Sequence, residues 1–266
     1  MMTIQTGHVG EHLRQWRQRR HLSQLDLATE AEISARHLSF METGRAQPSR
    51  EMLLRLAEQL DIPLRERNVM LVAGGFAPAF PQRTLDDPAM KVARDAIEQV
   101  LKAHEPHPAL AVDRHWNLVS ANRMVAPLLG GSAPKLLQGT VNVLRLGLHP
   151  DGIAARTENL HEWRAHLLER LHRQCEATAD AELLALYEEL KSYPVPPRSG
   201  PTAKVGDAIV VPFRLRVGND VLSFMSTTMV FGTPLDITLS ELALEAFYPA
   251  DETTAAKLRE IARSHT

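Results

Sequence analysis

Hydrophobic residues recur at helical spacing through the first quarter of the chain. Val9, Leu13 and Trp16 lie three and four residues apart, as the apolar face of one helix requires. The same spacing returns in residues 53–60, where leucines and an alanine fall at i, i+3, i+4 and i+7. Together these patterns predict five helices over residues 9–75.

Residues that favour helix ends divide this region into short helices. Ser23, Ser34 and Ser49 each precede an apolar helical pattern, and a serine hydroxyl can cap the free N–H groups of a first turn. Asp26 lies three residues after Ser23, which is the spacing of a capping box. Gly44 ends the third helix. The second and third helices are therefore short and joined by a tight turn, as in helix-turn-helix proteins.

The rest of the chain mixes helical and strand patterns after a stretch rich in proline and aspartate. Period-two alternation predicts strands, and longer amphipathic stretches predict helices. We therefore expect an α+β protein in which an all-α domain precedes a domain with an antiparallel sheet. The expected helices cover 88–104, 122–129, 159–177 and 180–191, with a short one from 253; the expected strands cover 109–112, 116–119, 209–217, 221–231 and 240–248.

Two of these strands carry the apolar residues that could surround a ligand. Val211 and Phe213 share one parity of the first long strand, while Met225, Met229 and Phe231 share one parity of the return strand. If the two strands pair as a hairpin, we expect these side chains to face one another. Methionine adapts to irregular apolar space, so a ligand pocket is one interpretation and an ordinary core is the other.

Composition narrows the class of protein. The chain has 266 residues, which suggests two domains at about 100–200 residues each. Its formal net charge is -2, so any nucleic-acid surface must be local. The single cysteine, Cys175, excludes an internal disulfide framework. We see no secretory signal and no apolar run near the roughly 20 residues that span a bilayer, so we expect a cytoplasmic protein without membrane insertion.

Polar residues at the starts of the short helices are candidates for binding double-stranded DNA. The exposed start of a recognition helix can reach base edges, and helix N-termini attract phosphate. Each candidate has a plainer alternative, because Gln24 could act only as a cap and the arginines of residues 14–20 could form a solvated face. The candidate DNA-binding residues are Ser23, Gln24, Ser34, Ala35, Arg36, His37, Ser39, Arg45, Ser49 and Arg50.

The spacing of these residues resembles a known family. Residues 23–28 read S-Q-x-x-L-A, and residues 34–49 read S-x-x-x-L-S-x-x-E-x-G-R-x-x-P-S. This pattern is similar to the helix-turn-helix of the Xre and phage-repressor family. The resemblance implies that Gln24 and residues 34–37 contact DNA and that Glu42 is structural.

The second half of the chain resembles the MmyB-like ligand-binding domain that follows this type of helix-turn-helix. The resemblance rests on residues 107–110, 116–117, 121–122, 148–152, 231–236 and 248–251. It implies a PAS-like sheet with helices over one face, which binds a small apolar ligand such as a fatty acid. We therefore expect a DNA-binding domain over 1–76, a linker and connecting helix over 77–104, and a PAS-like ligand-binding and dimerisation domain over 105–266.

Candidate ligand-binding residues come from this second domain. A ligand carboxylate would need a cation at the pocket mouth, and Arg156, Arg164 and Arg214 are equal candidates. Asn122 could bind polar groups of a ligand or could only cap a helix. The candidate ligand-binding residues are Asn122, Arg156, Trp163, Val211, Phe213, Met225, Met229 and Phe231.

Enzymatic interpretations have little support in the sequence. His161 and His166 are five residues apart on a predicted helix and would not share a metal easily, and we find no phosphate-binding loop or dinucleotide fingerprint. We therefore expect no catalytic residue, metal or cofactor, apart from a possible bound fatty acid. The leading hypothesis is a ligand-responsive regulator that binds an inverted repeat as a homodimer. The alternative is a regulator whose second domain is a protein-interaction or dimerisation module.

Overall fold

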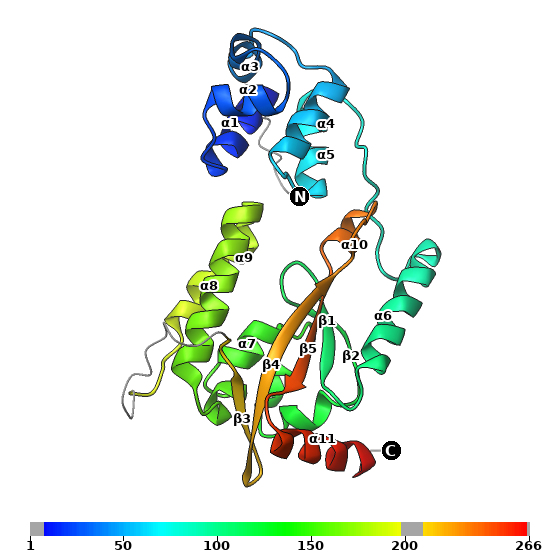
Figure 1. Ribbon diagram of the computed structural model, residues 1–266, viewed down its shortest axis with the longest axis vertical. Coiled ribbons are helices and arrows are strands. Elements are labelled where there is room, and N and C mark those ends of the chain that lie inside the picture. Colours follow the sequence, from blue (N-terminus) through cyan, green and yellow to red (C-terminus); the bar gives the residue numbers. More distant parts are fainter. Residues whose placement is uncertain (1–7, 198–209, 265–266) are drawn as a thin grey trace. The chain divides into compact units, whose positions relative to one another are not determined.

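A computed structural model of the protein describes residues 8–197 and 210–264. These residues form two compact units, one built mainly from residues up to Arg83 and the other mainly from the residues after it. The first unit contains helices only, whereas the second combines helices with one antiparallel sheet (Figure 1). The expected α+β fold is thus confirmed.

The helical unit has the five predicted helices, and their caps are those that the sequence indicated. Ser23, Ser34 and Ser49 each accept a hydrogen bond from a backbone N–H of the first turn, at 3.1, 3.1 and 3.2 Å. The Ser23 N–H donates to the Asp26 carboxylate at 2.9 Å, which completes the capping box. The helices are α1 (Val9–Arg19), α2 (Gln24–Glu30), α3 (Ala35–Glu42), α4 (Arg50–Gln59) and α5 (Leu64–Ala73).

Close packing fills the core of the helical unit. Leu13, Leu38 and Leu56 are completely buried among neighbouring apolar side chains. Gly10 of α1 lies against the end of α3, where a Cβ on this residue would be 2.1 Å from the carbonyl oxygen of Met41. Only glycine permits this approach, so α1 and α3 can lie in close contact here.

The second unit is built on a sheet of five strands in the order β2-β1-β5-β4-β3, with every neighbouring pair antiparallel. Its strands are β1 (Ala109–Val112), β2 (Leu118–Ala121), β3 (Phe213–Val217), β4 (Asp220–Val230) and β5 (Ala243–Pro249). Its α-helices are α6 (Lys91–Ala103), α7 (Val143–Leu148), α8 (Leu160–Thr178), α9 (Ala181–Ser192), α10 (Ile237–Ser240) and α11 (Glu252–Ser264). Short 3-10 helices cover Pro88–Met90, Ala126–Leu129, Pro134–Leu136 and Ile153–Arg156.

The two faces of the sheet carry different helices. Ile97 and Leu101 of α6 pack with Ala109 and Leu244 on one face, which we call the outer face. The inner face meets a larger apolar cluster, to which α7, α8, α9 and α11 all contribute buried side chains (Figure 1). The sheet is therefore buried on both sides, and only its inner face lies in the larger core.

The predicted facing of the two long strands is wrong. The register of β3 and β4 pairs Phe213 with Phe224, so these two side chains share the inner face. Met225 pairs with Tyr248 and therefore points to the outer face, as does Met229. A shift of one residue in register moves every side chain of a strand to the opposite face, and the sequence alone did not fix this register.

Several element boundaries also differ from the prediction. The helix expected over 122–129 is reduced to the single 3-10 turn at Ala126–Leu129, because Asn122 turns its side chain to the backbone. Helix α7 was not predicted. The strand expected from Trp116 begins two residues later, since Trp116 has a left-handed backbone with φ of 66°. Residue 209, the expected start of a strand, lies outside the described residues.

Candidate DNA-binding surface and ligand pocket

A buried ion pair holds the first three helices together. The Nε and Nη2 atoms of Arg17 donate to the two carboxylate oxygens of Glu42 at 2.6 and 2.9 Å. Gln24 donates its side-chain amide to Glu42 at 2.7 Å, and Arg17 also donates to the Leu22 carbonyl at 2.8 Å. One carboxylate on α3 is therefore bound to residues of α1 and α2.

This network shows where Arg17 and Gln24 lie in the helical unit. The hydrogen bonds from Glu42 raise the pKa of the Arg17 guanidinium, and the residue is buried rather than part of a solvated face. Gln24 is half-buried, and its amide nitrogen is engaged within the protein. Arg20 similarly donates to the carbonyls of Leu60 and Asp61, both at 2.8 Å. The contacts of Glu42 join α3 to α1 and α2, and those of Arg20 join the end of α1 to the residues after α4.

Most of the other predicted DNA-binding residues lie at the exposed starts of the helices or in the loop after α3. Ala35 and Ser39 are half-buried on α3. Arg36 and Arg45 form no ion pair with any residue that the structure describes. The exposed members of the predicted set are Ser23, Ser34, Arg36, His37, Arg45, Ser49 and Arg50.

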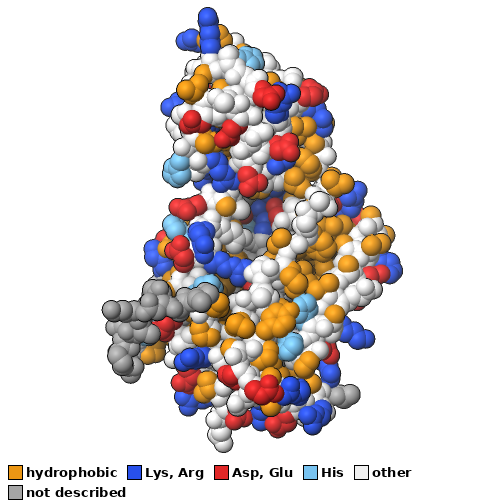
Figure 2. Space-filling view, in the orientation of Figure 1, with side chains coloured by type: hydrophobic (Ala, Val, Ile, Leu, Met, Phe, Trp, Pro, Cys, Tyr) orange, Lys and Arg blue, Asp and Glu red, His pale blue; other side chains and the backbone are white. Residues whose placement is uncertain are grey.

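Positive charge on the helical unit is local rather than general. Figure 2 shows the basic side chains, all of them arginines here, interspersed with Asp and Glu over α1 to α5. Residues 1–75 contain ten arginines, no lysine, two aspartates and seven glutamates. Unpaired cations such as Arg36 and Arg45 therefore matter more for anion binding than the net charge does.

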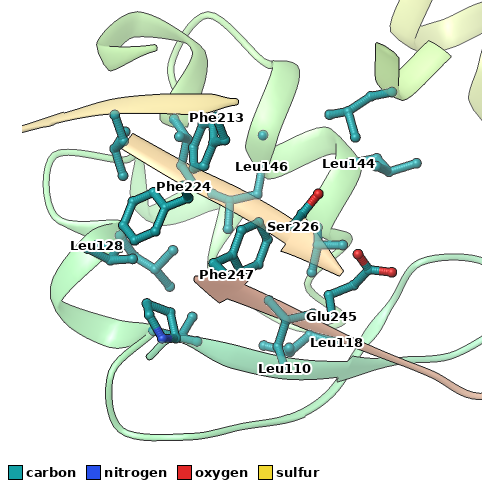
Figure 3. Close-up of a pocket in the computed structure, with 18 of the residues that line it drawn as sticks. Leu110, Leu118, Leu128, Leu144, Leu146, Phe213, Phe224, Ser226, Glu245 and Phe247 are labelled. Carbon is teal, nitrogen blue, oxygen red and sulfur yellow. The ribbon is translucent and has the colours of Figure 1, made fainter. Parts of the chain in front are cut away.

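An apolar cavity of about 120 Å³ lies in the second unit, between the inner face of the sheet and the helices that cover it (Figure 3). Trp163 of α8 stacks on Phe213 of β3, with ring centroids 4.9 Å apart, and Phe213 also lies near Phe224 and Phe247. Figure 3 shows these three phenylalanines grouped together. Aliphatic residues complete the wall, chiefly Leu110, Leu118, Leu128, Leu144, Leu146, Ile153, Leu167 and Leu215.

The cavity wall has one charged pair. Arg170 donates to the two carboxylate oxygens of Glu245 at 3.0 and 2.6 Å, and also to Thr228 at 2.8 Å. Its guanidinium lies 4.5 Å from the ring centroid of Trp116. Glu245 is 4 % exposed, so its charge depends on Arg170 for compensation. This part of the wall is polar but electrically neutral.

A histidine next to this pair has an altered protonation equilibrium. Burial lowers the pKa of His166, the positive charges of Arg170 and Arg173 lower it further, and Glu245 only partly opposes them. His166 also stacks on Trp163, with ring centroids 5.4 Å apart. The neutral imidazole is therefore favoured beside this pair.

The structure brings only two of the predicted ligand-binding residues, Trp163 and Phe213, to the cavity. Val211 is half-buried and packs against the inner core, whereas Met229 and Phe231 pack on the outer face. Met225 is 42 % exposed, and its position on the outer face removes it from the pocket. The expectation that these methionines face Phe213 fails for the register reason given above.

The polar candidates have other contacts. Asn122 is buried, accepts from the Ala109 N–H at 3.1 Å and donates to the His107 carbonyl at 2.8 Å. It therefore caps no helix start, because the 3-10 turn at Ala126–Leu129 has no side-chain cap. Arg156 does not line the cavity, but its Nη2 donates at 2.8 Å to the carbonyl of Leu128, which does. Arg164 donates to two carbonyls at the end of α9. Arg214 is exposed on β3.

Sequence reasoning missed Arg170 and Glu245. The available signal was weak, because Glu245 lies in a predicted strand at the same parity as Phe247, which indicates a buried position for a charged residue. Its partner is 75 residues away in the sequence. Nothing local indicated which arginine would compensate this carboxylate.

Comparison with known families agrees with both parts of this geometry. A helix-turn-helix family model matches residues 13–67, and the model of the MmyB-like transcription regulator ligand binding domain matches residues 93–261. No curated protein matches the chain. Together the two domains define a DNA-binding transcription regulator with a ligand-binding domain. The chain belongs to the family of MmyB-like transcription regulators.

In the described residues, no helix combines the length and the hydropathy that crossing a bilayer requires.

Proposed function

We propose that this regulator binds a specific DNA sequence as a cytoplasmic homodimer and that its second domain binds a small apolar ligand such as a fatty acid. The observation that carries the proposal is the apolar cavity in a chain whose α2 and α3 are braced as a helix-turn-helix. A ligand in such a cavity can alter DNA affinity only if it binds the DNA-competent and DNA-incompetent states with different strength.

On the DNA side, α3 is the proposed recognition helix. Residues 34–37 form its exposed first turn, which is the part of a recognition helix that meets base edges. Arg45 and Arg50 lie beyond its other end and are proposed to contact phosphates, together with Ser23 and Ser49 at helix starts. Because acids nearly balance bases in residues 1–75, one copy offers few phosphate contacts. A homodimer on an inverted repeat doubles them.

On the ligand side, the arginine contacts favour Arg156 as the partner of a ligand carboxylate. Arg170 lines the cavity but is already paired with Glu245. Arg156 donates only to carbonyl oxygens among the described residues, and burial lowers its pKa without an opposing carboxylate. An apolar chain in the cavity beside Trp163 and Phe213, with its carboxylate near Arg156, would use both features.

Native mass spectrometry of the freshly purified full chain tests the ligand part of the proposal. We expect a mass increment, matching a small lipid, that disappears when the protein is denatured. Selection of duplexes from a random pool tests the DNA part, and we expect enrichment of an inverted repeat with half-sites about one helical turn apart. An apo protein that shows no thermal shift with any fatty acid would contradict the ligand part alone.

One observation favours the alternative in which the second domain binds a protein. Val92 and Val100 of α6 are 80 % and 37 % exposed, although both are apolar residues. Exposed apolar groups of this kind occur at interaction surfaces. Retention of DNA selection by a chain that binds no lipid but captures a defined partner through these residues would favour this alternative.

A further inference from the structure

An aromatic ring on α3 lies beside two guanidinium groups. The Cζ atom of Arg36 is 5.3 Å from the ring centroid of Phe40, and that of Arg45 is 6.0 Å from the same centroid. Phe40 is half-buried, whereas both arginines are exposed. A cation within about 6 Å of an aromatic face is attracted by the ring quadrupole, so the ring restricts both side chains.

The backbone at the end of α3 fixes Arg45 relative to the same residue. The Arg45 N–H donates to the Phe40 carbonyl at 2.8 Å, and the Gly44 N–H donates to the Met41 carbonyl at 3.2 Å. This pair of bonds is a Schellman ending, in which the residue after the glycine folds back over the last turn. Gly44 has φ of 74°, which glycine adopts without strain. Arg45 is thus positioned by both its main chain and its side chain.

The charges of these two arginines are uncompensated. Neither Arg36 nor Arg45 has an acidic partner among the residues that the structure describes, whereas Arg17 of the same unit is bound to Glu42. Two like charges on one ring repel each other, and a nearby anion relieves that repulsion. The ring therefore holds two free cations in advance at the surface where DNA phosphates and guanine edges would lie.

We propose that Phe40 is a positioning residue of the DNA-binding surface, which aligns Arg36 for base recognition and Arg45 for the phosphate backbone without contacting DNA itself. The inference rests on the proposed function, because it takes α3 as the recognition helix. A side chain that is ordered before binding loses less conformational freedom on binding, so alignment by Phe40 increases affinity.

The test compares Phe40→Leu with Phe40→Tyr in the full chain, on a duplex that the wild-type protein has selected from a random pool. Leucine keeps the apolar bulk but removes the aromatic face, whereas tyrosine keeps both. We expect Phe40→Leu to weaken specific binding roughly fivefold to tenfold and Phe40→Tyr to leave it within about twofold. Thermal unfolding and circular dichroism of each variant show whether the fold is intact.

A double-mutant cycle separates positioning from a purely structural role. In a chain that already carries Arg36→Ala and Arg45→Ala, we expect Phe40→Leu to have no further effect on DNA affinity, because nothing is left for the ring to align. An equal loss in both backgrounds, or wild-type affinity of Phe40→Leu on the selected duplex, would overturn the inference while the proposed function stands. If the wild-type protein selects no duplex at all, the proposed function fails, and this inference fails with it.

Discussion

Each of the two units contains an arginine–glutamate pair with bidentate geometry and a buried glutamate, yet the surroundings of the pairs differ. Arg17 and Glu42 lie in a filled core, where Gln24 and a backbone carbonyl use the remaining donors and acceptors. Arg170 and Glu245 form part of the wall of a cavity. The exposed fraction of the arginine side chain is 10 % in the first pair and 26 % in the second.

This difference shows how the same interaction serves two purposes. In the helical unit, the pair fixes three helices at one geometry, as recognition of DNA requires. In the sheet unit, the pair supplies a neutral polar area beside an apolar space, and the unfilled volume leaves the core less tightly packed. We therefore expect the helical unit to respond sharply to changes in its core and the sheet unit to tolerate them better.

The largest expected effect comes from removing the acid of each pair. Glu42→Ala leaves Arg17 buried without compensation, so we expect a loss of about 3–5 kcal/mol in the free energy of unfolding of the helical unit. Glu245→Ala should be less harmful, because Arg170 is more exposed. Urea unfolding with hydrogen exchange of peptides from each unit measures both. The matched control is the double variant Arg17→Met with Glu42→Leu, which should restore most of the stability. Equal losses for the two alanine variants would contradict the expected difference between the two units.

Two helical glycines give the next largest contrast. Gly10→Ala places a Cβ against the Met41 carbonyl, and we expect a destabilisation of about 1–3 kcal/mol from overpacking. Gly147 of α7 lines the cavity, and an added Cβ there has no neighbour within 4 Å. Gly147→Ala should therefore stabilise the protein by up to about 1 kcal/mol through helix propensity. Thermal unfolding measures the change in stability of both variants. Destabilisation by Gly147→Ala would show that the space near the cavity is not free.

Ligand affinity distinguishes Arg156 from Arg214, two arginines of the sheet unit. We expect Arg156→Gln to weaken binding of dodecanoic acid about tenfold, because a charge-assisted hydrogen bond is lost, and to leave dodecanol binding unchanged. Titration calorimetry with both compounds measures the difference. The control is Arg214→Gln, on the exposed side of β3. Equal weakening of acid and alcohol would instead indicate a change in the shape of the pocket.

The smallest effect concerns pH. The folded protein lowers the pKa of His166, so the unfolded chain binds the proton more readily. The contribution of His166 to the free energy of unfolding is then constant above the pKa of the unfolded state, about 6.5, and decreases as the pH falls below that value. We expect the melting temperature of the sheet unit to fall between pH 7.5 and pH 5.5, and His166→Gln to reduce this fall. An unchanged pH profile in the variant would exclude His166 as a contributor.

The sequence predicted most of the helical unit because its signals are local. Ser23, Ser34 and Ser49 mark helix starts within three residues of the groups that they cap, and apolar spacing marks the buried faces. The candidate ligand pocket was harder to predict, because its parts meet only through the sheet. The register of β4 decides whether Met225 or Phe224 faces the cavity, and no short-range pattern contains that information. The Arg170–Glu245 pair likewise joins residues 75 positions apart.

The strand order also has a consequence for how the chain folds during synthesis. Strand β5 lies in the middle of the sheet, between β1 and β4, although it is the last strand of the sheet in the sequence. The ribosome must therefore make nearly all of the described residues before the central strand can join its neighbours, whereas the helices α1 to α5 are complete after residue 73. We expect the DNA-binding unit to fold early and the sheet unit late, because contacts between distant residues form slowly. The nascent chain would then contain a folded helix-turn-helix before its ligand cavity exists.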